Sequence, residues 1–157
     1  MITTMEPGNR LDLFEPGDLT LLVCHDVPEV RDLVVAQFSE LNYKIHTGLY
    51  PDDILLKMRT HQYDVIVLSA NFNAVPYEFC PIYLAATGVP PAQRRRQFIV
   101  LIGSQFATGD AMQSFAASVD LVIGLQDVMT LRPVFRRTLQ RHRDLYAPFH
   151  ETEKSVA

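Results

Sequence analysis

Apolar residues form short continuous runs along the chain, separated by segments in which apolar positions recur with helical spacing. The runs at 19–24, 65–68 and 98–102 are almost wholly apolar, and shorter ones occur at 43–47 and 121–123. Runs of this length and composition are typical of strands buried on both faces of a parallel sheet. The pattern therefore predicts five strands.

The segments between the strands predict helices over 28–41, from Pro51 onward, over about 110–118 and over 128–146. Asp26 and Asp127 are expected to cap the first and last of these, and Pro28 to lie in the first turn of its helix. The side chains expected to face the core are Val30, Leu33, Val34, Phe38 and Leu41, then Ile54, Leu55 and Met58, then Met112, Phe115 and Ala116, and finally Leu131, Val134, Phe135 and Leu139, with Leu145 as a further candidate.

Segment 71–97 contains four prolines, which exclude a long helix, and we expect a short helix near 78–87 followed by a loop. Strands alternating with helices indicate an α/β fold: a doubly wound three-layer sandwich around a five-stranded parallel sheet. Right-handed crossovers favour the flavodoxin-like strand order 2-1-3-4-5, with a site beside the first and third strands.

The 157 residues suit one domain, which we place at 18–146, after an extended lead-in at 1–17 and before a tail at 147–157. The net charge of −4 argues against a nucleic-acid partner. No apolar run is long enough to span a membrane, and no signal-peptide pattern opens the chain, so we expect a cytoplasmic protein. Cys24 and Cys80 are expected as reduced thiols, Cys24 inside a buried strand. No spacing typical of a metal or cofactor site is present, so we expect neither.

Polar residues follow the predicted strands where each ends. His25 and Asp26 follow the first strand, Ser69 and Asn71 end the third, and Ser104 follows the fourth. The carboxyl ends of parallel strands share one edge of a sheet, which is where α/β proteins build their sites. These residues are therefore the candidates for a functional site.

The order and spacing of these positions over residues 18–142 resemble a response-regulator receiver domain. In that family an aspartate at the end of the third strand accepts a phosphoryl group, and two acids after the first strand bind a divalent metal. The resemblance places the acceptor on Ser69, the acid pair on His25 and Asp26, the carbonyl ligand on Asn71, the switch hydroxyl on Ile102 (or, after a one-residue shift, near Ser104), the aromatic switch on Leu121, and the lysine and proline on Gly124 and Leu125.

These departures predict that receiver chemistry fails. A serine hydroxyl cannot form the acyl phosphate that a carboxylate forms. One remaining acid should bind Mg²⁺ weakly, and Gly124 supplies no cation for the transition state. We therefore expect a phosphorylation-independent pseudo-receiver, not an enzyme, that acts as a protein–protein interaction module in signalling or assembly.

Two other functions stay open. A small flavodoxin-like enzyme or ligand-binding domain would use His25, Ser69 and Ser104, although no GxSxG motif surrounds Ser69 and two polar residues filling a vacated pocket explain the pattern as well. A homo-oligomeric structural subunit is the third candidate.

Basic residues on the last helix are candidates for a docking surface, and an ordinary exposed helix face is the alternative. Receiver domains commonly dock partners through helix 4, strand 5 and helix 5, which the resemblance places at about 110–143 and which would also suit a homodimer. The run 94–96 is expected to be a solvated loop or a contact for an acidic partner. The candidate docking residues are Arg132, Arg136, Arg137 and Arg141.

Overall fold

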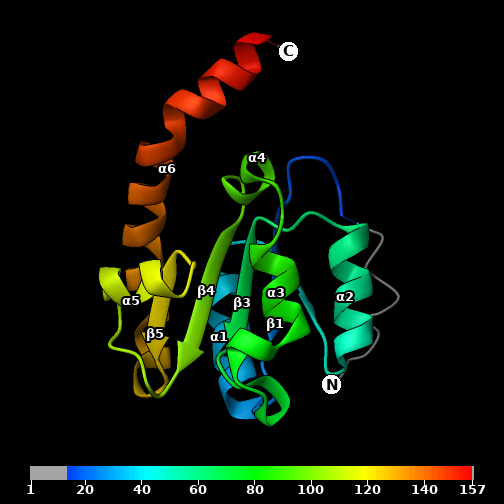
Figure 1. Ribbon diagram of the computed structural model, residues 1–157, viewed down its shortest axis with the longest axis vertical. Helices are drawn as coiled ribbons and strands as arrows, with labels where there is room; N and C mark the ends of the chain where they lie inside the picture. Colours follow the sequence, from blue (N-terminus) through cyan, green and yellow to red (C-terminus); the bar gives the residue numbers. More distant parts are fainter. Residues whose placement is uncertain (1–13, 157) are drawn as a thin grey trace.

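The computed structural model describes residues 14–156, with side chains as far as Pro148, so the expected lead-in lies mostly outside the described residues. A five-stranded parallel sheet forms the centre of the molecule (Figure 1), and its strand order β2-β1-β3-β4-β5 confirms the predicted topology. The strands are β1 (Leu19–Cys24), β2 (Tyr43–Thr47), β3 (Val65–Ser69), β4 (Phe98–Gly103) and β5 (Leu121–Gly124).

Helices cover both faces of this sheet, as a doubly wound sandwich requires. One core layer packs the sheet against α1 and α6, through Val34, Phe38 and Phe135, and the other packs it against α2 and α3, through Ile54 and Ile82. The helices are α1 (Pro28–Glu40), α2 (Pro51–Thr60), α3 (Pro81–Thr87), α4 (Pro91–Arg94), α5 (Ala111–Ala116) and α6 (Leu131–Val156), and the 3₁₀ turns are η2 (Phe72–Ala74), η3 (Tyr77–Phe79) and η4 (Leu125–Thr130).

Several predicted features of the strands and helices are confirmed. Proline stands in the first turn of α1 and α2, where its missing N–H costs nothing. Cys24 and Cys80 are buried free thiols, and burial raises the pKa of Cys24. The predicted helix at 78–87 corresponds to η3 and α3, and α4 adds one helical turn within the expected loop. No helix in the described part of the chain is long and apolar enough to cross a bilayer.

The last helix differs from its prediction at both ends. It begins at Leu131, because the 3₁₀ turn η4 precedes it, and it runs through Val156, so it includes residues 147–156 of the segment assigned to a tail. Figure 1 shows its C-terminal half reaching past the amino ends of the strands. Asp127 does not cap this helix, since its carboxylate accepts a hydrogen bond from the Thr108 hydroxyl at 2.6 Å.

The helix α5 presents to solvent the side chains that its spacing placed in the core. Met112 and Phe115 are 76% and 82% exposed, and Ala116 is exposed too. Ser114 and Ala117 are buried in their place. The predicted burial of Leu33 and Leu145 is wrong as well, since both are exposed.

The hydrogen bonds of its first turn fix the rotation of α5 about the helix axis. Asp110 is the N-cap, and its carboxylate accepts from the Gln113 N–H at 2.9 Å. The Ser114 hydroxyl donates to the carbonyl of Asp110 at 2.9 Å, on the buried side of the same turn. A six-residue helix anchored in this way has no freedom to turn its apolar side chains inward.

Candidate functional site

The residues after β1 are held by backbone hydrogen bonds. His25 is 3% exposed, and its Nδ1 accepts from the Val27 N–H at 3.1 Å. Burial lowers the pKa of His25, an effect that the neighbouring Asp26 carboxylate partly opposes, so the imidazole is neutral near pH 7. A neutral ring whose Nδ1 already accepts a backbone N–H is poorly arranged to act as a general base through that atom.

Asp26 does not cap α1, which is a correction to the sequence-based expectation. The N-cap position is Val27, with no side-chain hydrogen bond. The Asp26 carboxylate instead accepts from the N–H of Asn73, at 2.9 Å, across the carboxyl edge of the sheet. Asn73 has a positive φ of 54°, a conformation that asparagine tolerates better than most residues.

Ser69 ends β3 with its hydroxyl engaged locally. It is 4% exposed; the hydroxyl donates to Asn71 Oδ1 at 3.3 Å and accepts from the Asn71 N–H at 3.2 Å. Ser69 and Asn71 thus meet, as the sequence predicted, but in a closed turn. The β1–β3 register pairs Cys24 with Leu68, the residues directly before His25 and Ser69, so these two residues follow neighbouring strand ends. No described hydrogen bond joins His25 or the exposed Ser104 to Ser69.

The ends of β4 and β5 leave little space for added side chains. Ile102 lies opposite Ser69 in the sheet and is part of the hydrophobic core, with its carbonyl accepting from the Ala70 N–H at 2.8 Å. At Gly124 a Cβ atom would lie 2.9 Å from the carbonyl oxygen of Phe106 and 2.9 Å from Nε2 of Gln126. The position that the resemblance assigns to a lysine is therefore sterically closed as well as uncharged.

The loop after β4 closes this edge. The Gly124 N–H donates to Thr108 Oγ1 at 2.8 Å, and the Gly109 N–H donates to the Val122 carbonyl at 2.9 Å. Thr108 in turn donates to Asp127, so one side chain links the loop to β5 and to η4. Among the described residues no group of three His, Cys, Asp or Glu is placed to hold a metal ion.

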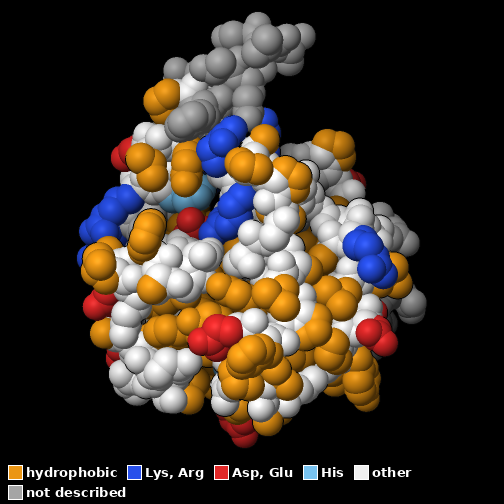
Figure 2. Space-filling view, viewed as in Figure 1, with side chains coloured by type: hydrophobic (Ala, Val, Ile, Leu, Met, Phe, Trp, Pro, Cys, Tyr) orange, Lys and Arg blue, Asp and Glu red, His pale blue; other side chains and the backbone are white. Residues whose placement is uncertain are grey.

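A groove lies between α5 and α6, on the face where the resemblance implies docking. Its volume is about 280 Å³, and its lining includes Phe115, Leu145 and Tyr146 together with Arg141. Met129, 75% exposed on η4, adds another large apolar side chain to the surface. Figure 2 shows apolar side chains spread over one side of the molecule, with basic side chains on either side of a hollow in which a histidine is visible.

The four candidate arginines do not share one face of α6. Arg132 pairs with Glu40 of α1 at 2.7 Å, and this contact ties the two helices together. Arg141 follows nine residues later, about two and a half helical turns, and so lies on the opposite side, at the groove. Arg136 and Arg137 are exposed between these two positions.

The three arginines before β4, at 94–96, do not all have the same role. Arg94 faces inward, and its guanidinium donates to Asp120 Oδ2 at 2.9 Å, to the Gln97 carbonyl at 2.9 Å and to the Ser118 carbonyl at 3.1 Å. The Arg94 side chain therefore links the turn before β4 to the start of β5. Sequence reasoning missed this role, because the partners of Arg94 lie up to 26 residues away.

Comparisons with known proteins support the fold. No protein-family model matches the chain, and no curated protein matches it. Among solved structures, NtrX from Brucella abortus superposes with a TM-score of 0.64 at 15% identity, over 89% of this chain and 30% of its own. Chemotaxis protein CheY4 of Vibrio cholerae superposes with a TM-score of 0.59 at 17% identity, over 80% of this chain and 98% of its own. A response regulator from Hahella chejuensis superposes with a TM-score of 0.53 at 18% identity, over 82% of this chain and 92% of its own. At these identities the likeness establishes the fold, which is that of a receiver domain.

Proposed function

We propose that this chain is a pseudo-receiver, a signalling or assembly module that binds a protein partner without being phosphorylated. The observation that carries the proposal is the closed carboxyl edge of the sheet. The resemblance places the acceptor on Ser69, whose hydroxyl is bound to Asn71. It places the lysine on Gly124, where the Phe106 carbonyl would obstruct an added side chain.

Phosphoryl transfer needs an ionised nucleophile and positive charge at the transferring oxygens. Ser69 has no described contact with a base, and Asp26 is the one acid of the resemblance that the chain retains, already accepting the Asn73 N–H. A single carboxylate is a poor Mg²⁺ site, because this ion is usually held by several oxygen ligands. We therefore expect no catalytic activity at this edge.

The docking surface that we propose consists of Met112, Phe115, Leu145 and Arg141, on α5 and α6. Three of these side chains are large, apolar and exposed, and the fourth supplies charge at the groove. Interfaces are commonly built from apolar anchors with a charged rim. The proposal includes a cytoplasmic location, which the buried, unpaired cysteines favour.

Mass spectrometry of the intact protein tests the first part of the proposal. Wild type and Ser69→Asp would be incubated with acetyl phosphate and Mg²⁺, beside an active receiver domain as the positive control. We expect no phosphoryl addition to wild type and little to Ser69→Asp, because Gly124 still supplies no cation. Stoichiometric addition to wild type would overturn phosphorylation independence.

The docking surface is tested with Phe115→Glu and a matched control, Leu56→Glu. Both side chains are exposed, and Leu56 lies on α2, away from the groove. Quantitative affinity capture from the native host should lose specific partners at least tenfold with Phe115→Glu and keep them with Leu56→Glu. Light scattering of the same variants asks whether the partner is a second copy. Equal recovery and equal mass for wild type and both variants would exclude this surface.

A further inference from the structure

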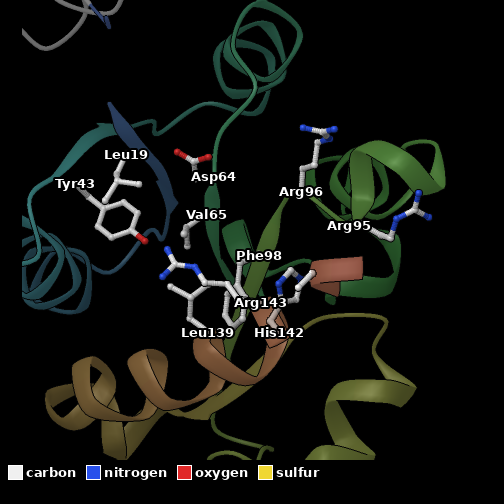
Figure 3. Close-up of a pocket in the computed structure, with 11 residues that line it drawn as sticks. Leu19, Tyr43, Asp64, Val65, Arg95, Arg96, Phe98, Leu139, His142 and Arg143 are labelled. Atoms are coloured by element: carbon white, nitrogen blue, oxygen red, sulfur yellow. The ribbon is translucent and has the colours of Figure 1, made fainter. Parts of the chain in front are cut away.

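A second cavity lies at the opposite, amino edge of the sheet, away from the degenerate receiver pocket. Its volume is about 420 Å³, within the range of small-molecule pockets. Figure 3 shows it between the first residues of β1, β3 and β4 on one side and the middle of α6 on the other. Neither the resemblance nor the proposed docking surface assigns a role to this edge.

The floor of this cavity is apolar. Leu19, Val65, Phe98 and Leu139 line it from β1, β3, β4 and α6. The ring of Tyr43, at the start of β2, completes the floor and is held edge-on against Phe38 and Phe135 in the core. A flat apolar group would replace water on this surface with favourable contacts.

The rim of the cavity is cationic, although the whole chain is acidic. Arg95 and Arg96 lie on the turn before β4, and Arg143 lies on α6. The one acidic side chain in the lining is Asp64, whose Oδ2 already accepts from the Thr20 N–H at 2.9 Å and from its hydroxyl at 3.3 Å. Figure 3 shows the guanidinium groups of Arg95 and Arg96 turned outward and that of Arg143 turned into the cavity. The negative charge of Asp64 is partly neutralised by its hydrogen bonds.

Arg143 and Tyr43 form the polar centre of the site. Figure 3 shows the guanidinium of Arg143 turned toward the Tyr43 hydroxyl, and the two are close enough for Arg143 to lower the pKa of that hydroxyl against the larger effect of burial, which raises it. The hydroxyl therefore stays protonated at neutral pH and can donate a hydrogen bond. A guanidinium fork beside a phenolic donor suits a carboxylate or phosphate oxygen pair.

The cavity is formed in advance of any ligand. Arg94 fixes the turn that carries Arg95 and Arg96, through its ion pair with Asp120 and its two carbonyl contacts. Asp120 also accepts from the Ile99 N–H at 2.8 Å, so the turn is joined to both β4 and β5. A site that needs no ordering on binding retains more of its contact energy as affinity.

We infer that this amino-edge cavity binds a small molecule that joins a flat apolar body to a carboxylate or phosphate group. The apolar floor takes the body, and Arg143 with Tyr43 takes the anionic group. The volume accommodates one such molecule and is small for an extended peptide, so a peptide ligand is an alternative for the experiment to exclude.

The test is an NMR titration of amide shifts with phenyl phosphate as the probe. We expect saturable shifts at Tyr43, Phe98 and Arg143. Phenol has only the apolar ring and inorganic phosphate only the anionic group, so each should bind at least tenfold more weakly than phenyl phosphate. A parallel titration with 3-phenylpropionate shows whether a carboxylate serves as well as a phosphate, and either preference fits the inference.

Two variants and a control make the assignment specific. Arg143→Gln should weaken phenyl phosphate binding about tenfold and Tyr43→Phe severalfold, whereas Arg137→Gln, exposed on another side of α6, should leave it unchanged. The inference is overturned if inorganic phosphate binds as well as phenyl phosphate, or if Arg143→Gln has no effect. Tighter binding of an acidic peptide carrying one phenylalanine at the same amides would also overturn it, in favour of a protein partner.

Discussion

We predict that protonation of His46 destabilises the fold. His46 is 4% exposed on β2; its ring stacks on that of Phe14 at 4.1 Å between centroids, and a 2.6 Å hydrogen bond joins its Nδ1 to the Tyr63 hydroxyl. Its Nε2 is buried without a hydrogen-bond partner among the described residues. Burial, with smaller effects from His61 and Lys57, lowers the pKa of His46 from 6.5 to about 4.

The sign and size of the effect follow from this shift. Because the folded pKa lies below the unfolded value, the unfolded state takes up the proton first as the pH falls. Full stability is present above about pH 6.5 and is lost progressively toward pH 4. With pKa values of 6.5 and about 4, the free energy of unfolding falls by about 2 kcal/mol between neutral pH and pH 5, and by about 3 kcal/mol in the limit.

The assay is urea unfolding of wild type and His46→Gln at about pH 7.5 and about pH 5. Glutamine keeps a hydrogen-bonding group but does not titrate. At the higher pH His46→Gln should be the less stable protein, since it loses the stack on Phe14. At the lower pH the difference between the two should shift by about 2 kcal/mol in favour of the variant.

Other titrating groups should not affect the difference in the free energy of unfolding between wild type and His46→Gln. His25, whose pKa is also lowered by burial, and the carboxylates contribute to both proteins and cancel in the difference. His61→Gln serves as the control for loss of a neighbouring histidine and should keep most of the pH dependence of wild type, because burial is the largest cause of the lowered pKa of His46 and His61 a smaller one. A stability difference between wild type and His46→Gln that stays constant within about 0.5 kcal/mol across this range would refute the reasoning.

Three further predictions follow from the packing. Gly124→Ala should lower the free energy of unfolding by about 1–3 kcal/mol, measured in urea, because the new methyl group meets the Phe106 carbonyl; an unchanged midpoint would contradict the closed edge. Arg94→Ala should lower the free energy of unfolding by about 2–3 kcal/mol in the same measurement, because Asp120 and two carbonyl groups lose a charged donor. A decrease under about 0.5 kcal/mol would show that these Arg94 contacts are not needed for stability. Cys24, buried and with a raised pKa, should react with a thiol reagent only as the protein unfolds, and rapid labelling under native conditions would contradict that burial.

The sheet and the larger helices were predictable because the sequence carries their signals locally. A run such as 98–102 has no polar residue and suits only a strand buried on both faces. Pro28 and Pro51 mark helix starts, since proline fits the first turn and little else in a helix. Strand order then follows from connection rules that need no side-chain detail.

The details of the candidate site were less predictable because they depend on contacts between distant residues. Asp26 and Asp127 both stand where a helix cap is expected, yet each accepts its hydrogen bond from a loop, 47 and 19 residues away respectively. The steric closure of Gly124 by the Phe106 carbonyl likewise comes from the path of the loop after β4. No local pattern encodes such contacts, although the serine and the glycine at the positions that the resemblance assigns to the acceptor and the lysine were visible in the sequence itself.

The largest error of local reasoning concerns α5, and it bears on function. Met112 and Phe115 are three residues apart, a spacing that predicts an inward apolar stripe, yet Asp110 sets the helix so that both point to solvent. Leaving two such side chains in water forgoes about 1.5–3 kcal/mol of burial each, and the isolated chain does not recover it. A partner that covers them would recover that free energy and would explain why apolar residues stand at these positions. Conflicts between local pattern and folded structure are expected to concentrate at functional surfaces. The mismatch at α5 thus supports docking at this face independently of the receiver resemblance, and Met112→Ser should then weaken partner capture without lowering the free energy of unfolding.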